Sequence, residues 1–493
     1  MLPVGRAVNR VVIGVAPNAA PEHLPKEQLC IHNHCVLTTV EGLSARHKTI
    51  VLVTCCLSLL ISSMDATIVN VALPTIRDQM HAPLPRLQWI VDIYTLTLAS
   101  LLMLSGAAAD RFGRRRMFRI GLTAFALGSL LCSLAPNVDT LIAARFVQAL
   151  GGSMLNPVAM SIITTVFTGR VERARAVGVW GAVVGISTAL GPMVGGGLID
   201  ALGWQSVFWI NLPICAVAFT LTTIFVPESK SATVRGIDPV GQVLAIAVMF
   251  SLVFGLIEHE PLIFAITAAA LAGFVYYEAR HRSPFIDLRF FRSVPFSSAT
   301  LMAICAFAGL GAFLFSASLY LQETRHYSAV HTGLLYLPMA VGMLICSPIS
   351  GRLVGRYGTR PSLVVAGAMM GLAAIMLTTL RPDTPVWQLV IMFATFGIGF
   401  GTVNAPITTA AVSGMPLDRA GAASAVASTS RQIGVSLGVA LCGLLTGASL
   451  WWVLAALAGG IIVLGVTANT RWAARTRDRV APLLEQKVPA HAG

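Results

Sequence analysis

Residues 178–197 read GVWGAVVGISTALGPMVGGG, and this stretch decides how the rest of the chain is interpreted. It holds seven glycines and one proline, yet it lies inside a long apolar segment. Such a helix would be poor in water, because each interior glycine costs about 1 kcal/mol relative to alanine. In lipid, the backbone must bond internally and small residues let neighbouring helices approach closely. We therefore interpret the stretch as a membrane helix built for close packing.

The composition of the whole chain is that of a polytopic membrane protein. Of 493 residues, 56% are hydrophobic and only 11% are charged, and the mean hydropathy is +0.77. Soluble globular proteins carry about 25% charged residues. The net charge of +13 would suggest nucleic acid in a soluble chain, but here the bases cluster in short loops, which favours a role in topology. We expect an all-α protein with no nucleic-acid partner, and we interpret the seven of its nine cysteines that lie within apolar runs as packing residues.

The amino-terminal stretch, residues 1–45, has no helical period and no apolar run of signal-peptide quality. It contains CIHNHC, with Cys30, His32, His34 and Cys35. Zinc ligands usually come as two separated pairs, and four ligands this close together would struggle to surround one tetrahedral ion. We interpret the stretch as a disordered cytoplasmic tail, or as residues upstream of a true start, and we expect no metal site and no cofactor.

Apolar runs long enough to cross a bilayer recur along the chain. A span needs about 20 residues at helical rise. The first candidates are 49–71, 87–109, 117–136, 139–162, 174–199 and 205–226. A second series follows at 238–257, 261–279, 296–321, 332–354, 361–380, 385–413, 421–446 and 450–470. The sequence therefore predicts fourteen transmembrane helices.

The distribution of arginine and lysine predicts which loops face the cytoplasm. With the amino end inside, the inner loops and flanks hold 24 basic residues, and the outer loops hold Arg77, Arg86, Arg325 and Arg381. Cytoplasmic loops of membrane proteins carry such an excess. We expect both termini in the cytoplasm, which requires an even number of spans, and a location in the plasma (inner) membrane.

Two similar loops predict two equivalent halves. GAAADRFGRRR, residues 106–116, follows the second span, and GRLVGRYGTR, residues 351–360, follows the tenth. Two similar helical bundles with substrate between them are usual in transporters that alternate access. We expect an amino-terminal six-helix bundle over 46–229, two inserted helices over 230–293, a carboxy-terminal six-helix bundle over 294–471 and a cytoplasmic tail over 472–493.

Charged side chains inside apolar segments are costly unless paired or hydrated, so they mark candidate functional positions. Asp65 lies late in the first span, Asp92 early in the second and Arg145 in the fourth, and both carboxylates fall toward the outer half of the membrane. Because desolvation favours the protonated carboxyl and a nearby arginine opposes this, movement of Arg145 could switch proton affinity. Other roles stay open. Asp65 could be hydrated near the outer surface, Arg145 could clamp backbone carbonyls, and Asp92 could be an interfacial residue.

The first basic loop also has a physical interpretation. Asp110 lies at the predicted cytoplasmic end of the second span, beside a cluster of arginines. A carboxylate there can pair with bases or with the amino-terminal dipole of a neighbouring helix when that side is closed. Breaking the contact would favour opening inward. The alternative is that this loop only marks topology.

Several motifs resemble one family. MDATIVNVALPTI (residues 64–76), GAAADRFGRRR and RFVQALGG (residues 145–152) are similar to signatures of the major facilitator superfamily, in its fourteen-span drug:proton antiporters of the EmrB/QacA type. The resemblance extends from residue 46 to residue 471 and implies two six-helix bundles plus two additional central helices. It places Asp65 at the family's acidic position and implies a part for Arg145 in proton coupling; with Asp92, these are the proton-coupling candidates. The residues that match the loop motif, with an expected gating role, are Gly106, Asp110, Arg111, Gly113 and Arg114.

The opening stretch resembles the antiporter motif of the fifth span. The matching residues, for which we expect a packing role, are Gly178, Gly191, Pro192, Gly195 and Gly196. GWQSVFWINLPI (residues 203–214) and GAASAVASTSRQIGVSLG (residues 421–438) resemble further signatures. The chain departs from the pattern at Ala149 and Ser187, where glycine is common, and at Gly355, which replaces an acidic residue in the second-half loop.

These observations predict a secondary active exporter rather than an enzyme. We expect a monomeric proton antiporter, surrounded by membrane lipid, that uses the proton gradient to move hydrophobic small molecules outward, cationic ones included, such as drugs or antibiotics. A same-fold symporter or importer of a small nutrient is the alternative, disfavoured by the fifth-span motif. A sensor or enzyme lacks support, because the sequence has no nucleophile–base arrangement and no GxxxxGK[ST] loop. The candidates for lining the substrate cavity are Gln148, Asn156, Arg431 and Gln432.

Overall fold

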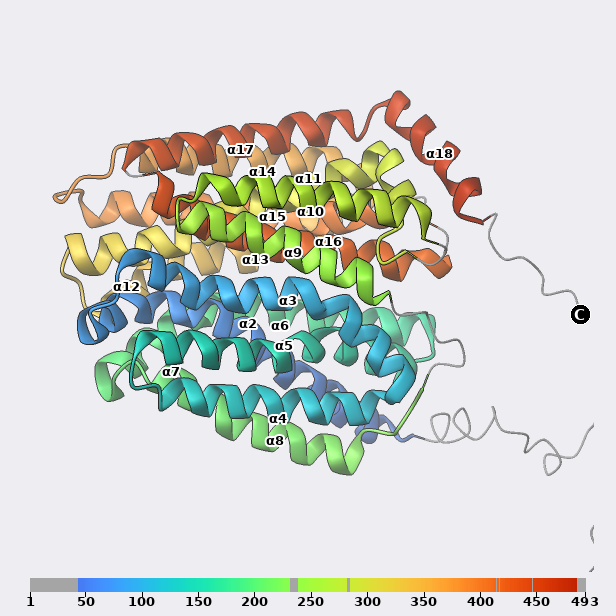
Figure 1. Ribbon diagram of the computed structural model, residues 1–493, viewed down its shortest axis with the longest axis horizontal. Helices are drawn as coiled ribbons and strands as arrows, with labels where there is room; N and C mark the ends of the chain where they lie inside the picture. The colour runs from blue at the N-terminus through green and yellow to red at the C-terminus, as the bar shows by residue number, and fades with distance from the viewer. Residues whose placement is uncertain are drawn as a thin grey trace, which may run out of the picture. The chain divides into compact units, whose positions relative to one another are not determined.

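The computed structural model describes residues 43–230, 238–281, 284–413, 415, 417–445 and 447–485. Across these ranges the regular secondary structure is helical, as the composition predicts (Figure 1). The CIHNHC stretch and the tail predicted around it, up to residue 42, lie outside the described residues.

The helices fall into two groups separated by a pair. The first group is α2 (Ala45–Met80), α3 (Leu84–Phe112), α4 (Arg114–Ser133), α5 (Val138–Val166), α6 (Arg170–Leu202), α7 (Ser206–Trp209) and α8 (Asn211–Phe225). The pair is α9 (Pro239–Ile257) and α10 (Pro261–Arg280), followed by the short turn η1 (Leu288–Arg292). The second group is α11 (Val294–Leu319), its continuation η2 (Tyr320–Thr324), α12 (Ala329–Leu335), α13 (Leu337–Tyr357), α14 (Thr359–Leu377), α15 (Val386–Val412), α16 (Leu417–Leu444) and α17 (Ala448–Thr467), and α18 (Arg471–Glu485) ends the described chain.

Each of the fourteen apolar segments falls on one of these helices, or on a short helix followed by a longer one at 205–226 and 332–354. By length and composition, eleven helices of the described residues are suited to cross a membrane, or twelve when the bent helix α6 is counted. α4 and α16 are long but less apolar. Four of the first six residues of α4 are arginines, and α16 is rich in serine and glycine.

The packing neighbours of the first group recur in the second. α2 packs against α5, α6 and α8, and α11 packs against α15, α16 and α17. Likewise α4 packs against α3, α5 and α8, and α14 packs against α13, α15 and α17. The first group, coloured blue to green, lies together in the lower part of the view (Figure 1). The two groups meet where α3 packs against α16, α2 against α11, and α6 against α12 and α13.

The pair α9 and α10 is attached beside the contact between α3 and α16. The two helices pack against each other, and α9 also packs against α3 and α16. Gln242 of α9 donates a hydrogen bond to the carbonyl oxygen of Ser100, and Trp89 Nε1 donates to Glu258 Oε1 at 2.9 Å. α9 therefore contacts both groups, so a relative movement of the two groups would change the contacts of α9.

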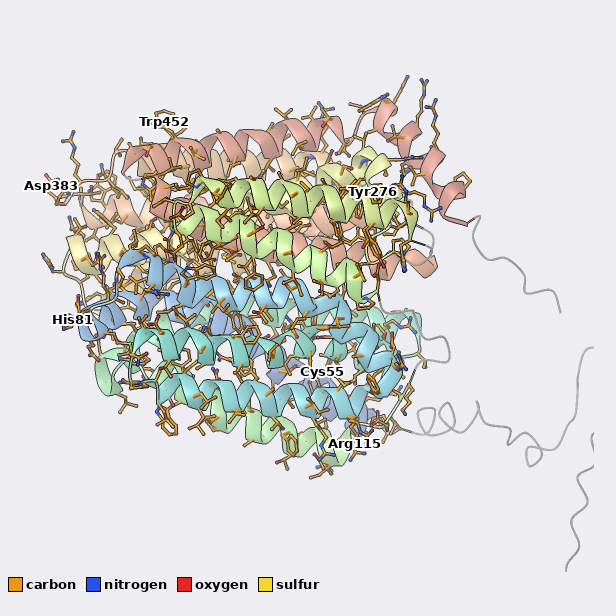
Figure 2. All side chains as sticks on the ribbon, viewed as in Figure 1. Cys55, His81, Arg115, Tyr276, Asp383 and Trp452 are labelled. Carbon is orange, nitrogen blue, oxygen red and sulfur yellow. The ribbon has the colours of Figure 1, made fainter. Side chains whose placement is uncertain are left out.

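The two ends of the helices differ in charge. One end carries the turn between α3 and α4, with Arg111, Arg114, Arg115 and Arg116; we call it the basic end, and Arg115 marks it in Figure 2. The other end carries the turns at His81 and Asp383, which are labelled at the left of the same view, and we call it the opposite end.

The turn between α3 and α4 depends on Gly113. Its φ is +110°, which L side chains rarely adopt, and a Cβ there would lie 2.6 Å from Glu228 Oε1. Glu228 Oε1 in turn accepts a hydrogen bond from the backbone N–H of Arg115 at 3.1 Å. Glycine is thus required both by the backbone conformation and by the carboxylate that holds the start of α4.

Gly113→Ala is expected to lower the free energy of unfolding by about 1–3 kcal/mol, because alanine must adopt a strained backbone conformation. Thermal unfolding of the purified protein in detergent measures the change. Gly169→Ala is the matched control, since Gly169 lies at the same end with φ −67° and a Cβ there would make only ordinary contacts. Equal destabilisation of the two variants would contradict the requirement.

Candidate functional site

A fully buried ion pair lies inside the first group. Asp65 of α2 is 0% exposed and Arg145 of α5 is 1% exposed, and Arg145 Nη1 lies 2.5 Å from Asp65 Oδ2. Gln148, one helical turn after Arg145, accepts a hydrogen bond from the same Nη1 at 2.6 Å. Asp65 is therefore a paired intramembrane charge and not a residue hydrated near the outer surface.

The second oxygen of Asp65 is also hydrogen-bonded. Asp65 Oδ1 accepts from Gln148 Nε2 at 2.8 Å and from Asn211 Nδ2 at 3.1 Å. Both amides also donate to Ser129 Oγ of α4, at 2.8 Å and 3.3 Å. A buried charge is tolerated only when it is paired and hydrogen-bonded. Both carboxylate oxygens of Asp65 thus have donors, and one of them also lies beside the Arg145 guanidinium.

Arg145 is positioned from α3 as well. Its Nε donates to the carbonyl oxygen of Ile90 at 3.2 Å, and its Cζ lies 4.1 Å from the centre of the Tyr94 ring. A cation over an aromatic face is held more strongly when water is excluded. The clamp on a backbone carbonyl and the ion pair therefore exist together. We call this cluster the buried polar network: Asp65, Tyr94, Ser129, Arg145, Gln148 and Asn211.

Asp92 of α3 is buried but stands apart from this network. It is 0% exposed on the side of α3 that packs against α16, where the Ser436 hydroxyl is the donor that faces it, and neither carboxylate oxygen makes an ion pair or a well-formed hydrogen bond within the described residues. An anion without such partners is costly in a membrane interior. The contact between α3 and α16 thus suits a neutral carboxylic acid, and Asp92 is not at an aqueous interface.

The glycine-rich helix α6 packs against the helical turn that carries Asp65. A Cβ at Gly191 would lie 2.1 Å from Thr67 Oγ1, and a Cβ at Gly195 would lie 2.5 Å from Ile68 Cγ1. α6 also bends by 41° between residues 171–188 and 190–202. The bend occurs where Pro192, which has no N–H, cannot complete the hydrogen bond to the carbonyl of residue 188.

One face of α6 is packed near the opposite end and open toward the basic end. A Cβ at Gly196 would lie 2.3 Å from the carbonyl oxygen of Ala329 in α12. Gly178, Gly181 and Gly185 fall on the same helical face, but within the described residues no atom outside their own helical turns lies within 4 Å of their Cβ positions. In α13 of the second group, the Cβ positions at Gly351 and Gly355 are equally open.

Contacts between the two groups gather at the opposite end. They include an ion pair, a side-chain hydrogen bond to a carbonyl, and a carboxylate bound to a backbone amide. We call this set the opposite-end seal: Arg77 Nη1 to Glu323 Oε2 at 2.9 Å, Gln88 Nε2 to Val439 O at 2.7 Å, Ala329 N to Asp200 Oδ1 at 3.2 Å, and Gly196 against Ala329.

Comparison with known families decides the class of the protein. The family model of the Major Facilitator Superfamily matches residues 55–439. The chain belongs to this superfamily. It is therefore a multi-pass membrane transporter and not an enzyme, as the sequence predicts.

Two superfamily members and one solved structure show the extent of the similarity. The multidrug resistance protein Stp of Mycobacterium tuberculosis is 35% identical over 407 residues, covering 81% of this chain and 76% of that protein. The tetracenomycin C resistance and export protein of Streptomyces glaucescens is 34% identical over 395 residues, covering 78% and 73%. A crystal structure of the peptide transporter POT in complex with sulfate covers 92% of this chain and 99% of that chain with a TM-score of 0.66; at 15% identity, it shows a shared fold.

The superfamily loop motif lies at the basic end of the transporter. Asp110 Oδ1 pairs with Arg114 Nη2 at 3.1 Å across the turn at Gly113, and Arg114 also donates to Thr165 Oγ1 of α5. Arg111 is exposed, with its Cζ 5.6 Å from the centre of the Phe112 ring. Asp110 therefore pairs with a base of its own helix group, which is one of the two contacts expected for this carboxylate.

The residues predicted to line a substrate cavity have different surroundings. Gln148 is fully buried, and both ends of its amide belong to the buried polar network. Asn156 is half-buried and accepts a hydrogen bond from Ser62 Oγ at 3.2 Å. Arg431 and Gln432 are half-buried in α16; Arg431 donates to Thr408 Oγ1, and its Cζ lies 5.8 Å from the Phe307 ring centre.

Three members of the buried polar network are absent from the sequence prediction of site residues. Ser129, Tyr94 and Asn211 are neutral, and neutral polar residues are common in membrane helices. One signal in the sequence near Ser129 is the glycine at position 128. In the structure a Cβ at Gly128 would lie 2.3 Å from the Gln148 backbone, so this glycine lets α4 approach α5 closely at the network. Asn211 lies within GWQSVFWINLPI, which resembles a family signature, but nothing in that stretch indicates its partner.

Gly196→Ala is expected to weaken the opposite-end seal, because an added methyl group would meet the α12 backbone. Overpacking of this kind costs about 1–3 kcal/mol, which corresponds to a shift of roughly 5- to 150-fold in the equilibrium between the sealed and unsealed forms. Thr332→Cys, buried in α12, reports the change through faster labelling by a membrane-impermeant thiol reagent. In the same background, Gly178→Ala adds a methyl group in open space and should leave the labelling rate unchanged. Unaltered labelling in Gly196→Ala would refute the role of this contact.

Proposed function

We propose that the protein is a proton-coupled antiporter that exports hydrophobic small molecules, cationic ones included, by alternating access. Membership of the superfamily and the names of its relatives support this proposal, since Stp is named for multidrug resistance and the Streptomyces relative for resistance and export. Together with the quoted motifs, these relatives favour the fourteen-span drug:proton antiporters. The expected substrates are drug-like or antibiotic-like compounds.

The proposed topology has fourteen spans, and both termini lie in the cytoplasm. The transporter is placed in the plasma (inner) membrane. The recurring packing supports two equivalent bundles, 46–229 and 294–471, with 230–293 inserted between them. The excess of bases in one set of loops supports assigning the basic end to the cytoplasm. We take one chain to be the working unit, because it supplies both bundles.

With this topology, the conformation is the one that loads substrate from the cytoplasm. The opposite-end seal closes the outer side, while the glycine faces of α6 and α13 are open toward the basic end. An exporter must adopt this state to take up its substrate.

The observation that carries the coupling proposal is the contrast between the two buried carboxyl groups described in the first bundle. Asp65 has a donor at each oxygen and is paired with Arg145, whereas Asp92 has no ion-pair partner and no well-formed hydrogen bond in the described part of the chain and lies at the contact between the bundles. We infer that Asp65 anchors α2 to α5 as an anion and that Asp92 carries the proton. Only Asp92 lies on a surface that must separate when the outer side opens.

The proposed cycle couples the charge of Asp92 to the opposite-end seal. When the outer side is open, Asp92 takes a proton from the outside and becomes neutral, which allows α3 to close against α16. With the inner side open, the proton leaves toward the cytoplasm as substrate binds. The resulting anion is costly against α16, so the seal opens and substrate is released outside while Asp92 is reprotonated. One outward substrate movement is thereby linked to inward proton movement.

Transport in proteoliposomes tests this proposal. With the purified protein and a fluorescent lipophilic cation such as ethidium, a proton gradient should drive cation movement against proton flow, and an uncoupler should abolish it. Gradient-driven movement in the same direction as the protons would indicate symport instead. Transport that is unchanged by the uncoupler would refute proton coupling.

A further inference from the structure

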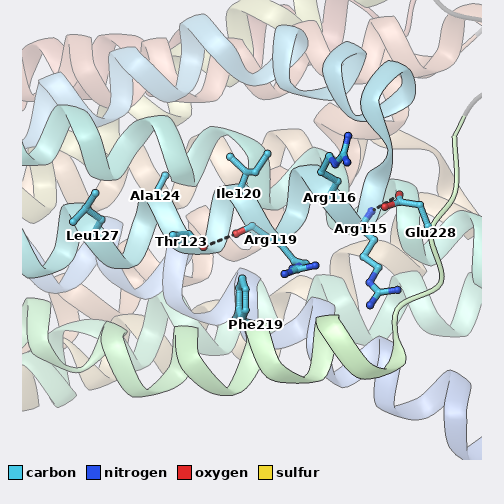
Figure 3. A pocket seen from close by; sticks show the side chains of 9 residues that line it. All are labelled: Arg115, Arg116, Arg119, Ile120, Thr123, Ala124, Leu127, Phe219 and Glu228. Atoms are coloured by element: carbon cyan, nitrogen blue, oxygen red, sulfur yellow. Dashed lines mark hydrogen bonds between the residues drawn. The ribbon is translucent and has the colours of Figure 1, made fainter.

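A groove at the basic end lies between α4 and α8, away from the contact between the bundles (Figure 3). Its volume is about 870 Å³. α4 contributes one helical face to it, with Arg116, Ile120 and Leu127 spaced four and seven residues apart, and α8 contributes Phe219. The figure shows these side chains around one hollow, with the arginines at one end and the aliphatic residues at the other.

The arginine end of the groove carries more positive than negative charge. Arg115, Arg116 and Arg119 line it, with Glu228 as the acidic residue. Glu228 Oε1 already accepts hydrogen bonds from the backbone N–H groups of Arg115 at 3.1 Å and Ser229 at 3.2 Å. Its carboxylate is thus partly committed to the chain itself, and the guanidinium groups remain in excess.

Two of the groove's arginines are held in place by the chain itself. Arg115 is oriented by a hydrogen bond to the carbonyl oxygen of Thr223, and the Cζ of Arg119 lies 4.9 Å from the centre of the Phe219 ring. The Nε atoms of both are buried without a hydrogen-bond partner in the described part of the chain. Arg116 is exposed beside them. Guanidinium groups bind phosphate through several parallel N–H donors, and fixed side chains lose less entropy on binding.

The other part of the groove is apolar and open to the surroundings. Ile120 is 46% exposed and Leu127 is 50% exposed, although both lie on a helix packed into the first bundle. From Arg116 to Leu127 the helix rises about 16 Å, which is roughly half the thickness of a bilayer hydrocarbon core. The groove therefore runs from headgroup level toward the middle of the membrane.

We propose that this groove is a binding site for an anionic phospholipid. The phosphate lies among Arg115, Arg116 and Arg119, and one acyl chain lies along Ile120, Leu127 and Phe219. Basic pockets between membrane helices recognise anionic headgroups in this way. A transported compound is a poorer fit, because α4 and α8 pack against α2 and α5 of their own bundle and the groove faces outward from it.

Native mass spectrometry of the purified protein in a mild detergent tests the site. Dioleoyl phosphatidylglycerol should bind more tightly than dioleoyl phosphatidylethanolamine, and glycerol 3-phosphate at equal concentration should not displace it. Arg116→Gln with Arg119→Gln should lower the affinity for phosphatidylglycerol about 10- to 30-fold, because each arginine near an anionic headgroup contributes to binding. The matched control, Arg352→Gln with Arg356→Gln, removes two exposed charges from α13 at the same end and should change the affinity less than about 2-fold.

A second variant tests the site even if the arginine variants do not fold. Leu127→Ser changes an exposed side chain, so the fold should persist, while binding of the dioleoyl lipid weakens more than that of a short-chain phosphatidylglycerol. Equal binding of the two headgroups, equal effects of the test and control pairs, or no chain-length effect in Leu127→Ser would each overturn the proposal. Displacement by glycerol 3-phosphate would instead identify a site for free anions.

Discussion

Replacing Arg145 with alanine is expected to cost about 3–5 kcal/mol of unfolding free energy and to abolish proton-driven transport. The reason is that Asp65 would lose the one positively charged contact that the described residues give it while remaining fully buried between α2 and α5. Breaking a buried pair from one side leaves an uncompensated charge, which is more damaging than losing the pair as a whole. The hydrogen bond to the Ile90 carbonyl and the contact with the Tyr94 ring would be lost as well. Thermal and denaturant unfolding in detergent measures the change.

A second substitution separates stability from function. In the double variant Asp65→Asn with Arg145→Ala no charge is left unpaired, so part of the lost stability should return while transport stays absent. Arg77→Ala is the matched control, since its ion pair with Glu323 is about one-third exposed at each side chain and should be worth about 1 kcal/mol or less. If Arg145→Ala were no more destabilising than Arg77→Ala, or if the double variant were less stable than the single one, the anchoring role of the pair would be wrong.

The sequence predicted the charged members of the site because charge inside an apolar run is costly and therefore conspicuous. Asp65, Asp92 and Arg145 could each be identified from their own neighbours in the chain. Their different roles could not be predicted, because these depend on which face of α3 each group meets. Ile90 and Tyr94 face Arg145, whereas Asp92, two residues from either, faces α16. A rotation of about 100° per residue separates these faces, and only helix packing decides what each face meets.

The fold was predictable to the level of apolar segments and their repeat, since both are written in hydropathy and in the two basic loops. The partners of Asp65 were not, because Asn211 lies 146 positions away and Gln148 lies 83 positions away. The opening stretch shows the same limit. Its glycines predicted close packing, and the structure distinguishes Gly191, Gly195 and Gly196, which are packed, from Gly178, which is open. Glycines occur toward both ends of α6, and the neighbouring helices decide which of them are packed.

Asp92→Asn is expected to reduce proton-driven export at least about 100-fold while changing the unfolding free energy by no more than about 1 kcal/mol. An asparagine has nearly the shape of the neutral acid, so the contact of α3 with α16 should persist. It cannot release a proton, so the charge that opens the opposite-end seal would never develop. The variant should therefore remain sealed at the opposite end, bind substrate from the basic end and fail to export it. Export from inverted vesicles, substrate binding in detergent and labelling of Thr332→Cys measure these three properties.

The controls decide between the two carboxyl groups. Asp139→Asn removes a carboxylate at the same end of the bundle whose side chain is 70% exposed beside Arg86, and it should leave all three properties unchanged. Asp65→Asn should lower stability, because Arg145 then becomes the unpaired buried charge, whereas Asp92→Asn should not. Uncoupler-sensitive export by Asp92→Asn would indicate that Asp65 carries the proton instead, since no other carboxylate described in the first bundle is buried at this depth. A difference in transport without a difference in folding is what separates a group that carries the proton from one that holds the helices together.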